Sequence, residues 1–381
     1  MSYEVDNELF YEEEIEEMDE NTRKLNISSF QNTSTFNIDL NIDTVVSYYN
    51  RKKFVFDPEF QRRNVWDDNR KSKFIESLIL NIPTPSILLA DDKKRNEFII
   101  IDGKQRLSTI IDFISPTNSG KGFKLKNLEI LKELNGYNYE KLSNDEEKIE
   151  FLSQLQNYPI KTSIVRNYDD ALLYFIFARL NSGSVPLSTQ ELRHTIFPGE
   201  FSIFINKRSA ENINLKKILK LKKDKVDVRM KDAELLCRYY AFKYHLEHYE
   251  NTVGSLLDIT YEKLNSMWQT KKDQIEKDLL EFDKSVEFIY EKFGDFAFKL
   301  YSIERKEYGQ FNRLVFDLLT THFSYEDNRE RVNKSSLVLK DFFESLFSIA
   351  EFDAAFKPVT SSKEKTLTRF KIFKEKFDLK Y

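Results

Sequence analysis

The stretch Glu97-Phe-Ile-Ile-Ile-Asp-Gly-Lys-Gln-Arg-Leu-Ser-Thr-Ile110 contains a change of hydrophobic period. Phe98 to Ile101 is a short apolar run rich in β-branched residues, which is typical of a buried strand. After Asp102-Gly103, apolar residues recur with the spacing of one helix face, at Leu107, Ile110, Ile111 and Ile114. The stretch therefore predicts a strand, a tight turn and a helix, with polar residues at the beginning of the helix.

The beginning of such a helix suits an anion, because its backbone N–H groups are unpaired and it carries a partial positive charge. Gly103 allows a close approach to the backbone and can adopt a positive φ. Lys104 and Arg106 add full positive charges. Asp102 could hold a metal ion or accept a proton, and Gln105 could orient a water molecule. A phosphate site is therefore one interpretation of the stretch.

A structural interpretation fits the same residues. Asp102 lies three residues before Gln105, which is the spacing of a capping-box variant, and Arg106 would then be an exposed helix residue. The stretch is neither a Walker loop nor a glycine-rich dinucleotide motif. Spacing alone leaves both interpretations open.

The composition indicates a large, helix-rich protein. The 381 residues exceed one ordinary domain, and 40% hydrophobic with 14% aromatic residues can fill a large core. Only 9 glycines and 8 prolines favour helices over a barrel or sandwich. Cys237 is the single cysteine, which excludes an internal disulfide and a cysteine-based zinc site. No apolar run is long enough for a membrane span and no signal peptide is visible, so we expect a soluble cytoplasmic protein without a membrane partner.

The charge pattern limits how the chain could contact nucleic acid. The net charge is −4, so a contact with DNA must use a local basic patch. Residues 1–34 begin with an acidic run that we expect to be a flexible tail, or a cover over a basic groove. The strongest basic cluster either contacts the DNA backbone or is a solvated surface, and its lysines are Lys216, Lys217, Lys220, Lys222 and Lys223.

Further elements are expected on both sides of the central stretch. Ser86 to Ala90 is predicted to be the hairpin partner of the strand Glu97–Ile101, and Asp67 to cap a helix before it. Pro159 to Val165 is predicted to be another strand. From Phe201 the apolar stripes predict an almost entirely helical bundle.

Two polar groups are placed near the predicted α/β unit. Gln61, Arg62 and Trp66 fall in a loop before the Asp67 helix, where Trp66 either stacks on a base or packs into the core. Ser188 and Glu191 have the spacing of a capping box. Other polar residues at helix ends have no such explanation, namely Arg179, Asn181, Gln190 and Arg193.

Other catalytic patterns are missing from the sequence. His245 and His248 lie at i, i+3, but no further metal ligand stands nearby. The C-terminal half has no histidine-led HNH nuclease finger. There is also no GxSxG elbow and no HExxH helix.

Several ordered motifs resemble the N-terminal domain of GmrSD-type restriction proteins. The first are Gln61-Arg62 with Trp66, then Ile82-Pro-Thr-Pro-Ser86, then Ile101-Asp-Gly-Lys-Gln-Arg-Leu-Ser-Thr109, which is similar to the family's Asp-Gly-Gln-Gln-Arg hallmark. Later ones are Arg179-Leu-Asn-Ser-Gly183, Leu187-Ser-Thr-Gln-Glu-Leu-Arg193 and Arg229-Met-Lys-Asp-Ala-Glu-Leu-Leu-Cys-Arg238. The resemblance runs from about residue 36 to about residue 240.

The resemblance implies an α+β protein, with a small ParB- and sulfiredoxin-like α/β domain followed by a mostly α-helical C-terminal domain. We therefore expect an acidic tail at 1–34, a ParB-like nucleotide- and DNA-processing domain at 35–200, and a helical domain at 201–381. The implied function is antiviral defence, in which an NTP is bound and hydrolysed to act on foreign or modified DNA. The implied enzyme class is a hydrolase.

Residue roles follow the same resemblance. The implied catalytic residues are Asp102, Gln105 and Arg106, with Mg²⁺ near Asp102. The implied nucleotide- or phosphate-binding residues are Gln61, Arg62, Gly103, Lys104 and Ser108. Accessory residues would be Trp66, Arg179, Asn181, Gln190 and Arg193. Lys104 departs from the family, where glutamine is usual, so phosphate binding survives but water positioning by that residue is in doubt.

Many members of the family carry an HNH nuclease domain, which we do not find in this sequence. Two alternatives to NTP hydrolysis therefore stay open. The first is an enzyme acting directly on modified DNA, a base-removing glycosylase or a nuclease, with a flipped base in the same pocket. The second is a non-enzymatic DNA-binding sensor that works with a separate nuclease subunit.

Overall fold

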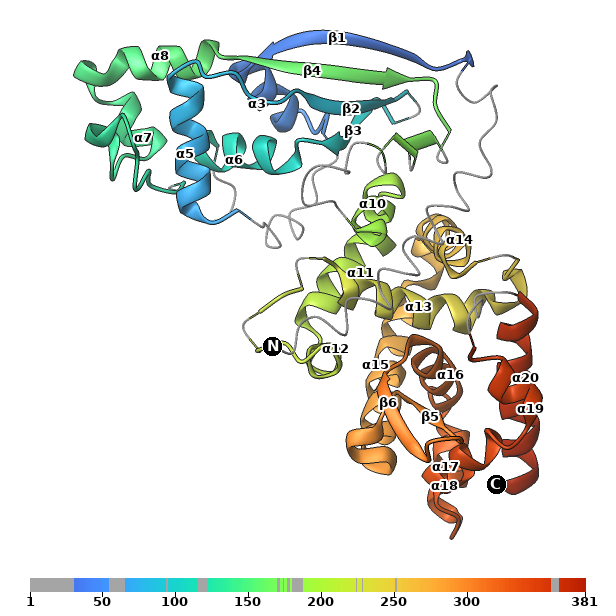
Figure 1. The fold of residues 1–381 in the computed structure, drawn as a ribbon. Coiled ribbons are helices and arrows are strands. Elements are labelled where there is room, and N and C mark those ends of the chain that lie inside the picture. Colours follow the sequence, from blue (N-terminus) through green and yellow to red (C-terminus); the bar gives the residue numbers. More distant parts are fainter. Residues whose placement is uncertain are drawn as a thin grey trace. The chain divides into compact units, whose positions relative to one another are not determined.

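The computed structural model describes residues 31–54, 66–93, 95–115, 122–169, 172–173, 175–176, 179, 188–223, 225–227, 229–250, 252–357 and 363–381. Two compact units can be separated in it, and each is described by itself (Figure 1). Of the described residues, 31–196 form an α/β unit and 197–381 form a helical unit. The predicted acidic tail lies almost wholly outside the described residues.

The α/β unit contains a four-stranded mixed sheet. Its strands are β1 (Ser34–Asn41), β2 (Ile87–Asp92), β3 (Glu97–Asp102) and β4 (Pro159–Arg166), in the order β1-β4-β2-β3. The β2–β3 hairpin is antiparallel, as predicted, whereas β4 runs antiparallel to β1 and parallel to β2. The sequence therefore indicated three of the four strands correctly, and β1 was not predicted.

Helices cover one face of this sheet. They are α3 (Ile42–Asn50), α5 (Asp68–Ile79), α6 (Lys104–Ile114) and α8 (Ile149–Asn157), with the short α7 (Tyr139–Ser143) (Figure 1). Helix α10 (Thr189–Ile196) belongs to the same unit and contacts β3. Along β4, Ile160, Thr162 and Ile164 are buried while Lys161 is exposed, so these three side chains point toward the covered face. Asp67 caps α5 as predicted, because its Oδ1 accepts the Arg70 N–H at 2.8 Å.

The helical unit begins with α11 (Glu200–Glu211) and α12 (Ile213–Ile218) and centres on α13 (Lys231–His245). The other helices are α14 (Val253–Ser266), α15 (Trp268–Phe293), α16 (Arg313–Phe323), α17 (Glu326–Lys334), α18 (Leu339–Leu346), α19 (Ala350–Ala354) and α20 (Lys363–Lys380). A hairpin that was not predicted, β5 (Lys299–Ser302) with β6 (Glu307–Phe311), interrupts the helices. In the described part of the chain, no helix has the length and apolar character that crossing a membrane requires.

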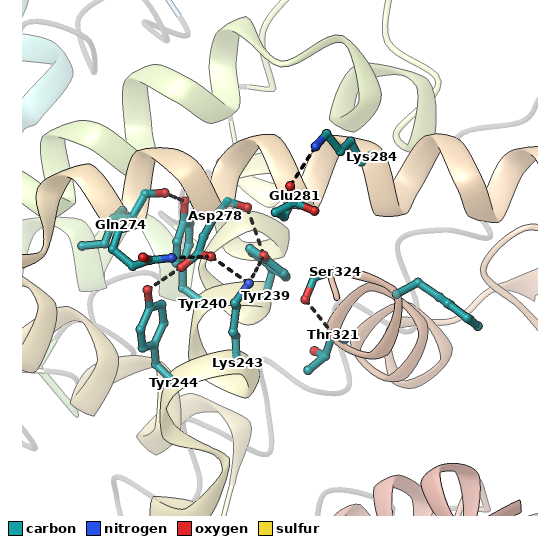
Figure 2. Close-up of polar contacts among 12 residues, drawn as sticks. Tyr239, Tyr240, Lys243, Tyr244, Gln274, Asp278, Glu281, Lys284, Thr321 and Ser324 are labelled. Carbon is teal, nitrogen blue, oxygen red and sulfur yellow. Dashed lines mark hydrogen bonds and ion pairs between the residues drawn. The ribbon is translucent and has the colours of Figure 1, made fainter. Parts of the chain in front are cut away.

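A polar cluster joins α13 to α15 inside the helical unit (Figure 2). Asp278 is only 2% exposed, and its carboxylate receives Lys243 Nζ at 2.8 Å, Gln274 Nε2 at 3.1 Å and the Tyr244 hydroxyl. Tyr239 and Tyr240 donate their hydroxyl groups to backbone oxygens of α15. Three donors hydrogen-bond to the Asp278 carboxylate, so its buried negative charge is compensated. The cluster therefore fixes how α13 and α15 pack against each other.

Two buried histidines should make the helical unit lose stability in mild acid. Burial lowers the pKa of His245 to about 4 and the pKa of His322 to about 3, whereas an unfolded histidine has a pKa of about 6.5. The unfolded chain therefore binds more protons than the folded chain below pH 6.5, and the free energy of unfolding falls as the pH drops. At pH 5 we expect each histidine to cost about 2 kcal/mol relative to neutral pH.

Urea unfolding of the wild type and of His245→Gln, at pH 7.5 and at pH 5, measures this effect. The urea midpoint of the wild type should fall more between the two pH values than that of the variant. An equal fall in both proteins would show that His245 does not contribute to acid sensitivity.

Candidate functional site

The predicted phosphate site is a junction at which β3 ends and α6 begins (Figure 1). Gly103 is the N-cap residue of α6 and has a left-handed backbone, with φ +93°. No side chain caps this helix beginning. The interpretation of Asp102 as part of a capping box with Gln105 is therefore wrong, because the glycine occupies the cap position and the aspartate lies one residue too early.

Asp102 is paired with Arg106 instead. Arg106 Nη2 donates to Asp102 Oδ2 at 2.7 Å, and Arg106 Nη1 donates to the backbone oxygens of Pro85 and of Ser86, the latter at 3.2 Å. The Arg106 side chain is 14% exposed and that of Asp102 is 49% exposed. Arg106 is thus not the solvated helix residue of the structural interpretation. It fixes the chain before β2 against the end of β3, while the Asp102 carboxylate stays open to solvent.

Close packing around Gly103 explains why a glycine stands there. A Cβ atom built on Gly103 would lie 1.9 Å from Ile87 Cγ2 and 3.3 Å from Arg106 Nη2. The pairing of β2 with β3 is irregular between Leu88, which lies opposite Asp102, and Leu89, which lies opposite Ile100. Such irregularities bend a strand and turn its end toward a new direction. The junction therefore depends on contacts to the beginning of β2, which the motif alone did not reveal.

The other motif residues lie at different depths. Gln105 is half-buried, and its Oε1 is a buried acceptor with no hydrogen-bond partner among the described residues. Lys104 and Ser108 are only 5% and 4% exposed. Thr109 donates its hydroxyl to the Gln105 backbone oxygen at 2.7 Å, which leaves the glutamine side chain unaffected. An unpaired buried acceptor is costly, so Gln105 Oε1 is suited to a water molecule or a ligand that donates a hydrogen bond.

The donor set at the junction limits how a metal ion could be held. Among the described residues, no group of three histidine, cysteine or acidic side chains is placed to bind a metal, and the His245–His248 pair belongs to no such group. Asp102 supplies one carboxylate, of which Oδ2 already accepts from Arg106. Mg²⁺ usually takes only one or two carboxylates and completes its shell with water and substrate phosphates. The junction therefore fits Mg²⁺ carried by a nucleotide and does not fit an all-protein metal cage.

The more distant predicted residues are placed as follows. Trp66 packs against Phe74 with ring centroids 5.4 Å apart, and Arg70 lies over its ring at 4.8 Å, which favours the core role over base stacking. Gln190 and Arg193 are fully buried in α10 and share a hydrogen bond of 2.8 Å. Arg179 is exposed and lies over the Phe175 ring. Gln61, Arg62 and Asn181 lie outside the described residues.

Helix α10 contacts β3, so the fold brings two predicted motifs into one neighbourhood. The predicted capping box opens this helix: Ser188 N donates to Glu191 Oε2 at 2.6 Å, and Glu191 N donates to Ser188 Oγ at 3.1 Å. This box is confirmed. Gln190 and Arg193 are buried beside it, so their side chains are not open to solvent.

The basic cluster lies on the helical unit, in and after α12. Lys216 Nζ donates to the Lys223 backbone oxygen at 2.7 Å, and Lys217 Nζ lies 3.6 Å from the centre of the Tyr290 ring. Lys220, Lys222 and Lys223 are exposed. Lys216 and Lys217 therefore make contacts within the helical unit. The other three lysines lie after the helix and are exposed to solvent.

Comparison with known protein families gives a match that covers most of the α/β unit. The family model described as GmrSD restriction endonuclease, N-terminal domain, matches residues 42–198, and this segment contains the whole β3–α6 junction as well as α10. Neither the curated proteins nor the solved structures gave a match. Residues 42–198 of the chain are therefore similar to the N-terminal domain of GmrSD restriction endonucleases.

Proposed function

We propose that the α/β unit binds and hydrolyses a nucleoside triphosphate as part of a restriction-like defence protein that acts on foreign or modified DNA. The observation that carries the proposal is the β3–α6 junction, where an uncapped helix beginning lies beside an open carboxylate and an unpaired glutamine oxygen. The family supports the link to restriction and to DNA.

The terminal phosphates would lie against the first turn of α6. The backbone N–H groups there have no side-chain cap, which is the arrangement that binds phosphate oxygens at a helix beginning. Arg106 would act mainly as a positioning residue, because its guanidinium holds Asp102 and the chain at Pro85 and Ser86. It also contributes positive charge close to the phosphates.

The attacking water would be held by Gln105. Its Oε1 is an acceptor that the described protein leaves unpaired, and an oriented water is what a glutamine supplies in other nucleotide-hydrolysing sites. The open carboxylate of Asp102 would help to hold Mg²⁺ that arrives with the nucleotide, and this ion would neutralise charge on the phosphates. Proteins catalyse phosphoryl transfer mainly by positioning the reacting groups and by stabilising the negative charge on the phosphates.

Gln105→Leu is expected to lower the rate of NTP hydrolysis by about a hundredfold, the size of loss that follows from misplacing a reacting group. Nucleotide affinity should stay near that of the wild type, because the backbone donors of α6 are untouched. The measurement is phosphate release from each of the four NTPs with Mg²⁺, with and without glucosylated hydroxymethylcytosine DNA.

Asp112→Asn is the matched control, since Asp112 lies in the same helix and pairs with Lys71 at 2.7 Å away from the junction. It should keep full turnover. Equal turnover in Gln105→Leu and wild type would remove Gln105 from the mechanism, and unchanged turnover in Asp102→Ala would remove the whole site.

The other two functions give different results in the same assay. Damage to modified DNA without any nucleotide would move the chemistry onto the DNA base itself. Absence of every product, together with DNA binding that is weakened by Lys222→Glu with Lys223→Glu, would indicate a binding protein that works with a separate nuclease. The exposed position of these two lysines makes them the best residues for that test.

A further inference from the structure

The loop that leads into β2 has almost no backbone donors of its own. Its residues are Ile82-Pro-Thr-Pro-Ser86, called the 82–86 loop below. Pro83 and Pro85 carry no N–H group, so Thr84 supplies the one backbone donor between Ile82 and Ser86. All of these residues except Thr84 are exposed to solvent. The loop therefore depends on side chains from other elements for a fixed position.

Tyr158 holds the first half of the 82–86 loop. Its hydroxyl accepts the Thr84 N–H at 3.1 Å and donates to the Ile82 backbone oxygen at 2.8 Å. Thr84 Oγ1 lies 3.2 Å from the same hydroxyl. Tyr158 follows the last residue of α8 and comes directly before β4, and it is only 5% exposed. Because its ring is buried between two elements, the hydroxyl stays in one place and fixes the loop at Thr84.

Arg106 holds the second half of the same loop. Its Nη1 donates to the backbone oxygens of Pro85 and of Ser86, and its Nη2 donates to Asp102 Oδ2 at 2.7 Å. Tyr158 and Arg106 therefore hold neighbouring residues of one short loop. A continuous chain of hydrogen bonds results, which runs from the Tyr158 hydroxyl through the loop and the Arg106 guanidinium to the Asp102 carboxylate.

We propose that Tyr158 is a positioning residue of the β3–α6 site. Its hydroxyl fixes the 82–86 loop, the carbonyl groups of that loop fix the Arg106 guanidinium, and Arg106 fixes the Asp102 carboxylate. Tyr158 acts through Arg106 and contacts no reacting group. Its effect on turnover rests on the proposed function of the junction, whereas its effect on Arg106 does not.

The first test measures how well Arg106 is held, with Tyr158→Phe in the full chain. This change removes the hydroxyl and keeps the ring in the core. The Arg106 side chain is only 14% exposed, so it should react slowly with phenylglyoxal, a reagent for arginine. In Tyr158→Phe we expect its modification, followed by peptide mass spectrometry, to be about fivefold faster, as the loss of one hydrogen bond implies. Tyr137→Phe is the matched control, because the Tyr137 hydroxyl donates to Asp145 Oδ2 at 2.8 Å in the same unit. It should leave the rate at Arg106 unchanged.

The second test measures NTP turnover by the same variants. Tyr158→Phe should lower kcat by about tenfold, because the reacting groups are less well placed. KM should stay near that of the wild type, since the backbone donors of α6 are untouched. Arg106→Lys keeps the positive charge but loses the paired bonds to Pro85 and Ser86. In that background Tyr158→Phe should have little further effect, because both residues act through one chain of bonds.

Three results would overturn the role of Tyr158. They are an unchanged rate of Arg106 modification in Tyr158→Phe, a loss of kcat in Tyr137→Phe as large as in Tyr158→Phe, and full additivity of Tyr158→Phe with Arg106→Lys. A wild type that hydrolyses none of the four NTPs would instead contradict the proposed function. In that case the phenylglyoxal reaction alone decides whether Tyr158 positions Arg106.

Discussion

Gly103→Ala is expected to destabilise the α/β unit by about 3 kcal/mol or more, because a strained backbone and an overpacked contact add at one position. The backbone at Gly103 has φ +93°, and the new Cβ would lie 1.9 Å from Ile87 Cγ2. The neighbouring atom belongs to a side chain that is itself only 2% exposed and cannot move into solvent. Hydrogen exchange of the full chain should show lost protection in β2, β3 and α6, and NTP turnover should be lost with it.

Gly136→Ala separates backbone strain from the clash. Gly136 has φ +84°, but a Cβ there would have no atom within 4 Å. Its cost should be limited to strain, about 1 kcal/mol. In an Ile87→Ala background, Gly103→Ala should cost less than in the wild type, because the clashing methyl group is gone. If both glycine variants cost the same in the wild-type background, the Ile87 contact has no role.

The second large effect is expected from Asp317, in the core of the helical unit. Arg238 holds Asp317 with two hydrogen bonds, from Nε at 2.9 Å and from Nη2 at 2.6 Å, and both residues are almost fully buried. Glu234 lies 3.5 Å from Arg238 and 3.3 Å from Arg313, which completes a network of two positive and two negative groups. Asp317→Ala would leave two buried cations with one carboxylate, and the expected cost is about 3–5 kcal/mol.

Urea unfolding and hydrogen exchange of α13 and α16 measure this loss. Glu330→Ala is the control, because the Glu330–Lys334 pair is equally short, at 2.6 Å, but exposed to solvent. It should unfold like the wild type. Arg238→Met combined with Asp317→Leu removes both charges of the buried pair and should recover most of the stability lost in Asp317→Ala. A double variant as unstable as the single one would contradict the electrostatic explanation.

The β3–α6 junction could be predicted because its signals are local. An apolar run, a glycine and a helical repeat lie within the residues 97–114, and the observed elements end within one residue of the predicted change. Strand β1 was missed although Phe36, Ile38 and Leu40 alternate with polar residues. Such a short alternation indicates a strand only when the strand that pairs with it is known. The pairing strand, β4, lies more than a hundred residues later in the chain.

The depth of the site residues was less predictable than their identity. Lys104 stays a predicted phosphate-binding residue, but its side chain is buried, because it lies three residues before Leu107 and seven before Ile111, on the buried face of α6. The helical repeat predicts that the Lys104 side chain is buried, whereas its positive charge favours an exposed position. The partners of Arg106 at Pro85 and Ser86 could not be read from the motif, because the fold brings together residues about twenty positions apart.

The buried network of the helical unit could not be predicted from sequence at all. Arg238 and Asp317 are separated by 79 residues, and each sits in a helix that is buried on nearly all sides. Arginine and aspartate at such positions are usually exposed, so nothing in the local pattern marks them as partners. Only the packing of α13 against α16 brings them together.

The strand order has a consequence for the synthesis of the chain. The sheet is ordered β1-β4-β2-β3, so β4 lies between the first strand and the hairpin, yet it is the last strand of this sheet to leave the ribosome. Neither β1 nor β2 can complete its pairing until residues 159–166 have been translated. At ordinary elongation rates this delay is on the order of ten seconds after β3 has been made. During that interval the nascent chain holds apolar strand faces with unpaired edges, so the late arrival of β4 is the step at which aggregation competes with folding.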